Sequence, residues 1–192
     1  MATTLPRSRQ INMSNLAIKA QDLDLSGDLD VTDDVAVGGD IAVTGTTSVA
    51  GIKQGAVVVT NAATYAVLAA NSGKTHIIPD LTADTVITLP TAAADLYYKF
   101  IYGGVAADAQ DWIIKTGSNT NFYKGGVLHL DTNAGAGTDE LVPVYPNGTT
   151  NSMIDFDTPD AGTEIEVWCD GTNWYIHGQC AGVTAPTFAD NA

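Results

Sequence analysis

Three histidines, His76, His129 and His177, are the side chains of this sequence best suited to bind a transition metal or to transfer a proton near neutral pH. They lie far apart, each within an apolar or aromatic run, and no two have metal-ligand spacing on a helix. The sequence also lacks a G-x-S-x-G elbow, a glycine-rich phosphate loop and a paired-cysteine zinc motif. We therefore expect the histidines to be strand residues, and we expect neither zinc nor nucleotide chemistry.

Acidic side chains are abundant, and two carboxylates about 5 to 9.5 Å apart are sufficient for glycoside hydrolysis. Most of the aspartates, however, stand beside Gly, Thr or Asn in predicted turns, where bonding to nearby backbone explains them. The glutamates are only Glu140, Glu164 and Glu166. We predict that the chain has no catalytic residues, no cofactor and no metal site, and that the protein is not an enzyme.

Acidic corners of the chain could bind calcium, because hard cations prefer oxygen ligands. Four aspartates at the corners of the repeat described below would offer such ligands if three chains brought them together: Asp28, Asp33, Asp34 and Asp40. One chain shows no complete ligand set, so we expect these corners to be solvated.

The two cysteines, Cys169 and Cys180, are close in sequence, but their predicted positions oppose a disulfide. A hairpin that turns at residues 170–173 pairs Cys169 with Trp174 and leaves Cys180 opposite Thr163. Because a disulfide needs its two Cα atoms within about 7 Å, this register separates the thiols. We expect both cysteines to be small buried hydrophobic residues.

Aromatic residues gather at the same hairpin, where Trp168, Trp174 and Tyr175 could form a surface platform for a carbohydrate. Trp and Tyr are also favoured in strands and at subunit contacts, where the ring is buried and its polar atom finds a partner. We favour a role in the core or in a subunit contact.

Charge is distributed unevenly along the chain. Residues 1–20 contain Arg7, Arg9 and Lys19 and no acid, whereas the remaining five basic and 22 acidic residues give the rest a charge of −17. Such an acidic body repels phosphate backbones and anionic lipid, so we expect no nucleic-acid or membrane partner for it. The basic segment is either a docking arm or a solvated terminus. Without a signal-peptide pattern or a long apolar run, the protein is expected to be made in the cytoplasm.

Five hexads follow the basic segment without a slip in register: LDLSGD, LDVTDD, VAVGGD, IAVTGT and TSVAGI. The third place is apolar in all five and the first place in four, with Thr47 as the exception, and the fifth places are mostly glycine. Each hexad therefore predicts a short strand with two inward side chains, followed by a corner. The inward side chains are Leu23, Leu25, Leu29, Val31, Val35, Val37, Ile41, Val43 and Val49.

Five hexads are too few for one chain to enclose this apolar stripe. A left-handed β-helix needs about three hexads per coil and several stacked coils. Three chains around a threefold axis could each supply one wall instead, so we predict a homotrimer with a β-helical or β-prism neck over residues 21–54. The alternative is an irregular meander packed on the rest of the chain.

From residue 55 onward, short β-type runs recur about every ten residues, which is typical of a sandwich or small barrel. Alternation is clear at residues 164–169, where the acids face one side and Ile165, Val167 and Cys169 the other. No convincing helix is found. We predict an all-β chain with an arm over 1–20, a β-sandwich or jelly-roll-like head over 55–184 and a tail over 185–192. The expected strands are 56–60, 64–68, 75–78, 85–89, 97–102, 112–116, 126–130, 140–145, 152–156, 163–169 and 174–178.

The repeat LDLSGDLDVTDDVAVGGDIAVTG resembles the β-helical necks of phage fibres and of trimeric head-decoration proteins. The runs ATYAVLAANSGKTHIIPDL, TVITLP, YYKFIYGG and EVWCDGTNWYIHG are similar to the β-sandwich heads of such proteins. The resemblance covers roughly residues 23–180. It implies a virion protein: a trimer that decorates the capsid exterior, binds the shell of major capsid protein and stabilises it as a cement protein.

We expect the basic arm to attach the protein to the capsid. We expect its cations to pair with an acidic capsid surface while its apolar side chains are buried against the shell. The arm residues in question are Arg7, Arg9, Ile11, Met13, Leu16, Ile18 and Lys19. The main alternative is a tail-fibre or receptor-binding tip whose head recognises a host surface glycan, and a third is a spike that depolymerises such a glycan.

Overall fold

The computed structural model describes residues 35–39, 41, 43–44, 55–105, 109–133 and 141–191. The chain divides into two compact units, Met1–Val49 and Ala50–Ala192. In the first unit, the described residues 35–39, 41 and 43–44 contain neither helix nor strand. The predicted arm and most of the predicted neck lie outside the described residues. The second unit contains all the described strands, and the segment predicted as the head, residues 55–184, lies within it.

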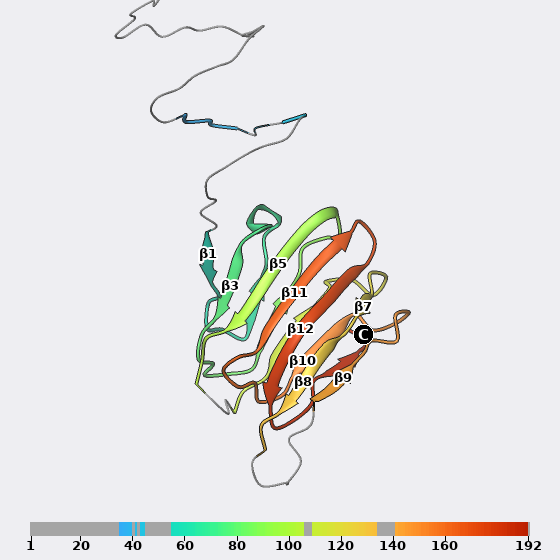
Figure 1. Cartoon of the computed structure of the whole chain (residues 1–192). Helices are drawn as coiled ribbons and strands as arrows, with labels where there is room; N and C mark the ends of the chain where they lie inside the picture. The colour runs from blue at the N-terminus through green and yellow to red at the C-terminus, as the bar shows by residue number, and fades with distance from the viewer. Residues whose placement is uncertain are drawn as a thin grey trace, which may run out of the picture. The chain divides into compact units, whose positions relative to one another are not determined.

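Eight strands form the larger sheet, which we call sheet A. Seven follow one another across it in the order β1-β3-β5-β11-β12-β8-β9, and β7 also pairs with β12. Their bounds are Ala56–Val58 (β1), Thr75–Ile78 (β3), Ala94–Tyr102 (β5), Tyr123–Gly125 (β7), Val127–Asp131 (β8), Leu141–Val144 (β9), Glu164–Asp170 (β11) and Trp174–Gly182 (β12). The long strands β5, β11 and β12 lie side by side in the middle of this sheet (Figure 1).

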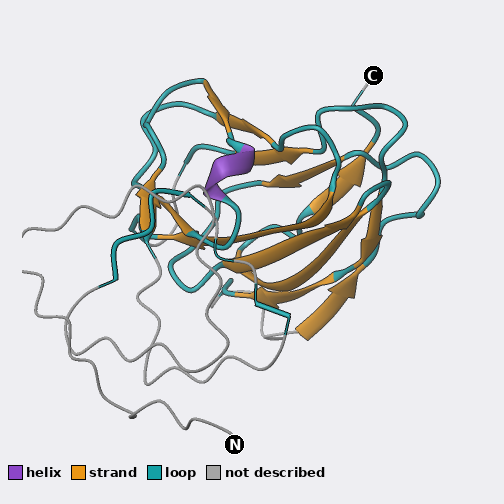
Figure 2. Ribbon diagram, turned by 90° about the horizontal axis from the view of Figure 1, so that it is seen from above, coloured by secondary structure: helices purple, strands orange, loops and turns teal. Residues whose placement is uncertain are grey.

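Five strands form the smaller sheet, sheet B, in the order β13-β10-β6-β4-β2. Their bounds are Thr64–Ala66 (β2), Thr85–Thr88 (β4), Trp112–Lys115 (β6), Met153–Phe156 (β10) and Thr187–Ala189 (β13). Figure 2 shows the strand-rich unit from above, with one short 3-10 helix, Ala69–Asn71 (η1), among its loops. Among the described residues the fold is therefore all-β, as the sequence predicts.

The first six strands alternate between the two sheets. β1, β3 and β5 pair in parallel in sheet A, while β2, β4 and β6 pair in parallel in sheet B. The chain thus winds as a two-sheet coil over residues 56–115 before antiparallel pairs, such as β5–β11 and β11–β12, complete the sheets. Both sheets are mixed, and this parallel winding in the head was not foreseen from the sequence.

Aromatic side chains fill the space between the two sheets. Trp112 of β6 is fully buried, with its ring centroid 6.2 Å from that of Phe100 in β5 and 4.7 Å from that of Phe156 in β10. Tyr65 of β2 approaches the ring of His76 in β3 at a centroid distance of 6.5 Å. Phe100, Trp112 and Phe156 are fully buried and Tyr65 is partly buried, so their rings remove apolar surface from water, which is the main favourable contribution to folding.

The β11–β12 hairpin has the predicted register, with Cys169 opposite Trp174. Its turn is fixed by Asp170, whose Oδ1 accepts hydrogen bonds from the backbone N–H of Thr172 at 2.8 Å and of Asn173 at 2.7 Å. Gly171 between them has a φ of +97°, which a residue with a Cβ rarely adopts. Both cysteines are free and buried, as predicted.

The expected strands match the observed ones to within a few residues at each end, and two strands were missed. One is β7, beside β12. The other is β13, which lies in the predicted tail and pairs with β10, so residues 187–189 belong to the head. Three-residue strands with no alternating apolar pattern give little signal in a sequence.

Candidate functional site

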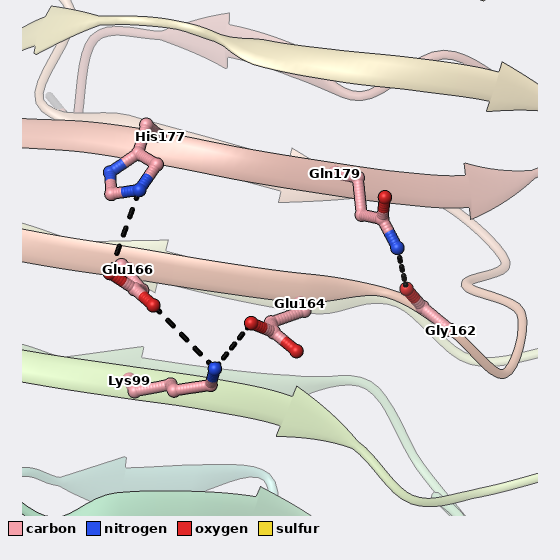
Figure 3. Close-up of polar contacts among 6 residues, drawn as sticks. All are labelled: Lys99, Gly162, Glu164, Glu166, His177 and Gln179. Carbon is pink, nitrogen blue, oxygen red and sulfur yellow. Dashed lines mark hydrogen bonds and ion pairs between the residues drawn. The ribbon is translucent and has the colours of Figure 1, made fainter.

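Strand alternation places a group of polar side chains on the face of sheet A that points away from the core. They come from three adjacent strands: Lys99 from β5, Glu164 and Glu166 from β11, and His177 and Gln179 from β12. The register sets Glu166 opposite both Lys99 and His177, so the side chains meet above the sheet (Figure 3). We refer to these five residues as the outer-face cluster.

Side-chain contacts link four of the five residues of this cluster. Lys99 Nζ contacts Glu164 Oε1 and lies 3.5 Å from Glu166 Oε1, while His177 Nε2 lies 3.5 Å from Glu166 Oε2. The hydrogen bond to Glu164 is the main reason that the pKa of Lys99 is raised. The side chains of Lys99, Glu164 and Glu166 remain 27%, 42% and 25% exposed, so the cluster is open to solvent.

Gln179 occupies the end of the cluster. Its Nε2 donates a hydrogen bond of 3.1 Å to the carbonyl oxygen of Gly162, and its amide oxygen points away from that contact (Figure 3). Beside it the surface is hollowed by about 280 Å³. The hollow is lined by Leu128, Glu164, Glu166, His177, Gly178 and Gln179. The site therefore combines two carboxylates, an imidazole and a carboxamide around one open depression.

A pair of aromatic rings adjoins the cluster. Trp168 of β11 and Tyr175 of β12 are cross-strand neighbours, with ring centroids 5.7 Å apart and planes inclined by 13°. Trp168 also meets His177 edge to face at 5.3 Å, and it remains 39% exposed. The Tyr175 hydroxyl donates to Asp170 Oδ2 at 3.1 Å, which raises the pKa of Tyr175.

The core role expected for the aromatic residues of this hairpin is confirmed for one of them. Trp174 is fully buried in the core, whereas Trp168 and Tyr175 stand on the outer face, where the alternative of a subunit contact stays a prediction. Alternation itself separates them, because neighbouring residues of a strand point to opposite faces. Lys99, Gln179 and Leu128 were not identified as site residues from the sequence, since nothing in their local pattern indicates what lies opposite them.

The predicted trimer-core residues are partly within the described chain. Val35, Val37, Ile41 and Val43 are described, with exposed fractions of 62%, 47%, 70% and 53%. The other members of that set, and every residue of the predicted capsid-binding arm, lie outside the described residues. A row of large apolar side chains is thus open to solvent in the single chain.

The three histidines occupy different environments. His76 is fully buried among aromatic rings, and burial lowers its pKa. His129 is buried in β8, with Nε2 3.0 Å from the carbonyl oxygen of Gly182. His177 belongs to the outer face. Across the described ranges, no group of three or more His, Cys, Asp or Glu side chains is arranged to hold a metal ion.

An acidic cluster lies at one end of sheet B. Asp84 precedes β4, Asp111 precedes β6, Asp155 lies in β10 and Asp157 follows it. Burial, with the charges of the other three carboxylates, raises the pKa of Asp155 to about 6. Its Oδ1 is buried and has no hydrogen-bond partner within the part of the chain that the structure describes. The cluster is a source of repulsion in the folded chain.

No protein-family model matches this chain, and no curated protein is significantly similar to it. Within the described residues, no helix is long and apolar enough to cross a membrane.

Proposed function

We propose that this protein is a structural, non-enzymatic virion component: a homotrimer that binds the capsid exterior as a decoration or cement protein. The observation that carries the proposal is the exposed apolar row of the hexad repeat. Val35, Val37, Ile41 and Val43 recur at the first and third places of successive hexads, and each is about half exposed or more in the single chain.

Burial of this row gives the assembly its driving force. A Val or Ile side chain gains about 1.5 to 3 kcal/mol when it passes from water into a core. Three copies of the row around a threefold axis would bury one another, whereas a single chain leaves them in water. The resemblance of the repeat to the necks of phage fibres and trimeric decoration proteins supports the same assembly and supports a place on the virion surface. Made in the host cytoplasm, such trimers would then attach to the shell of major capsid protein.

The carboxylates of the outer face are already engaged with a neighbouring cation. Glu164 and Glu166 both contact Lys99 Nζ. This arrangement suits the outer face to contact rather than to catalysis.

Light scattering behind a sizing column tests the oligomeric state directly. We expect a mass about three times the 19.9 kDa of one chain. Val37→Asp should reduce that mass to one chain, because it places three like charges near one axis. Val105→Asp is the matched control, since Val105 is also exposed, at 62%, but belongs to the head. A monomeric wild-type protein, or a trimeric Val37→Asp variant, would contradict the neck assembly.

Attachment is tested by mixing the trimer with capsids that lack the protein and sedimenting both. We expect the full chain to sediment with the capsids and a variant without residues 1–20 to stay in solution as a trimer. If the full-length trimer ignores the capsids, the decoration role is wrong. If the shortened variant still sediments, the arm is not the attachment segment.

A further inference from the structure

We propose that the outer face of sheet A carries a binding site for a neutral saccharide, centred on Trp168, Glu166 and His177. The site would be independent of capsid attachment. It joins an exposed aromatic ring, a set of hydrogen-bonding groups already held in place, and a hollow that continues along the sheet. Most of the hydrogen-bonding groups line the hollow, and the ring of Trp168 lies beside them on β11.

The aromatic ring supplies the apolar contact. A sugar ring has one face made largely of C–H groups, and such a face packs well on the π-system of an indole. Trp168 is 39% exposed, and its ring is fixed by Tyr175 on one side and by the edge contact with His177. Tyr175 is fixed in turn by its hydrogen bond to Asp170. The ring therefore loses little conformational freedom when a ligand packs on it.

The polar groups match the chemistry of sugar hydroxyls, each of which donates one hydrogen bond and accepts others. Glu164 and Glu166 supply acceptors, while Lys99, His177 and Gln179 supply N–H donors beside them (Figure 3). Lys99, Glu164, Glu166 and His177 contact one another, and Gln179 is held by the carbonyl of Gly162, so these side chains are ordered before a ligand binds. Hydrogen bonds to charged groups of this kind are also the stronger ones.

Charge selects a neutral ligand over an ionic one. A sulfated or sialylated glycan would meet Glu164, Glu166 and Asp170 on a chain whose net charge is −14. A basic side chain from a protein partner would find the two glutamates already paired with Lys99. A polyol needs no counter-ion, and it uses the donors and acceptors of the pair without displacing it.

Two adjoining hollows indicate a chain of sugars rather than a single ring. The hollow beside the outer-face cluster has a volume of about 280 Å³, near the lower end for small-molecule pockets, which run from about 300 to 1,000 Å³. A second hollow of about 280 Å³ shares Leu128, His177 and Gly178 with it and extends to Pro143 and Tyr145. Tyr145 is 68% exposed, so one accessible aromatic ring lines the second hollow, and Trp168 lies beside His177, which lines both hollows.

The test is an array of immobilised oligosaccharides probed with the full-length protein. The array holds neutral gluco-, galacto-, manno- and N-acetylglucosamine oligomers, together with sialylated and sulfated ones. We expect wild-type protein to bind at least one neutral series. Trp168→Ala and Glu166→Gln should each weaken that binding about tenfold or more, as expected when an aromatic contact or a charge-assisted hydrogen bond is lost.

Two further variants make the test specific. Trp168→Phe keeps a ring at the site and should retain binding within about threefold. Leu68→Ala removes an exposed side chain, 60% exposed, that lines neither hollow, and it should bind like the wild type. If Trp168→Phe and Leu68→Ala both still bind, the weaker binding of Trp168→Ala and Glu166→Gln comes from the site and not from unfolding.

Several outcomes would overturn the proposal. These are binding to no neutral oligosaccharide, binding only to the anionic ones, and binding that survives both Trp168→Ala and Glu166→Gln. If no saccharide binds and Trp168→Ala instead lowers the mass in light scattering, the face is a contact between subunits. The capsid sedimentation experiment is unaffected by any of these results, so the two proposals fail separately.

Discussion

Replacing Asp155 by Asn should stabilise the protein at neutral pH and change its stability little at pH 4. Asp155 lies in β10, where burial and the charges of Asp111, Asp157 and Asp84 raise its pKa to about 6. A raised carboxyl pKa means that the folded state disfavours the charged form. The penalty is therefore absent well below the ordinary pKa of 3.8, small at pH 4 and fully developed above pH 6, so the wild-type protein loses stability across that interval.

The size of the effect follows from the shift. A change from the ordinary value of 3.8 to about 6 corresponds to at most about 3 kcal/mol, at 1.36 kcal/mol for each pKa unit. Asp155 is partly exposed, so water and salt screen part of the repulsion, and we expect about 1 to 2 kcal/mol. For a domain of this size that is a rise in Tm of roughly 4 °C at pH 7.

Thermal melts of the wild type and of Asp155→Asn, followed by circular dichroism from pH 4 to pH 8, measure this directly. The two curves of Tm against pH should lie close together at pH 4 and separate by pH 7. Asp95→Asn is the control, because Asp95 is exposed and its φ of +67° is one that Asn also tolerates. If Asp155→Asn melts at or below the wild type at pH 7, the acidic cluster is not repulsive.

Three other substitutions or treatments test the fold. Gly178→Ala should lower the free energy of unfolding by about 2 kcal/mol or more, because φ is +145° and a Cβ would overlap the carbonyl oxygen of Glu164; urea unfolding measures it. Trp112→Ala should cost about 3 to 5 kcal/mol in the same assay, since the ring is fully buried between the sheets. Burial raises the pKa of Cys169 and raises that of Cys180 to about 12, so neither thiol should react with a disulfide reagent at pH 8 until guanidinium is added.

The β11–β12 hairpin shows how much a sequence can fix. Strict alternation from Glu164 to Cys169 and a strong turn at residues 170–173 determine which residues pair and which face each one occupies. Both signals are local, within about ten residues, and both are governed by backbone geometry. The buried state of the two cysteines and the register between Cys169 and Trp174 followed from them.

The parallel winding of the first six strands could not be predicted from local sequence patterns. Each strand is followed by a turn that is equally compatible with an antiparallel hairpin. The local sequence does not indicate whether the next strand joins the same sheet or the other sheet. The choice is made by the core, where Phe100 and Trp112 from consecutive strands meet across the two sheets. Contacts of that kind depend on packing in three dimensions, so a pattern along the chain does not reveal them.

The outer-face cluster was missed for a related reason. Glu164 and Glu166 were visible as the polar side of an alternating strand, and His177 as a strand residue, but their meeting point depends on Lys99 in β5. That strand lies more than sixty residues earlier in the chain. A site assembled from three strands that are adjacent only in the sheet has no signature in the spacing of its residues.

Alternation also makes the core and the outer face independent of each other. Ile165 and Val167 are fully buried, while Glu164, Glu166 and Trp168 between and beside them face solvent. Substitutions on the outer face should therefore change what the protein binds with little effect on its stability, because the inward side chains keep their packing. The reverse holds for the inward positions. If Trp168→Ala and Glu166→Gln unfold the head, the outer face and the core are not independent. If the two variants melt at the temperature of the wild type, residues of the outer face can change binding without changing stability.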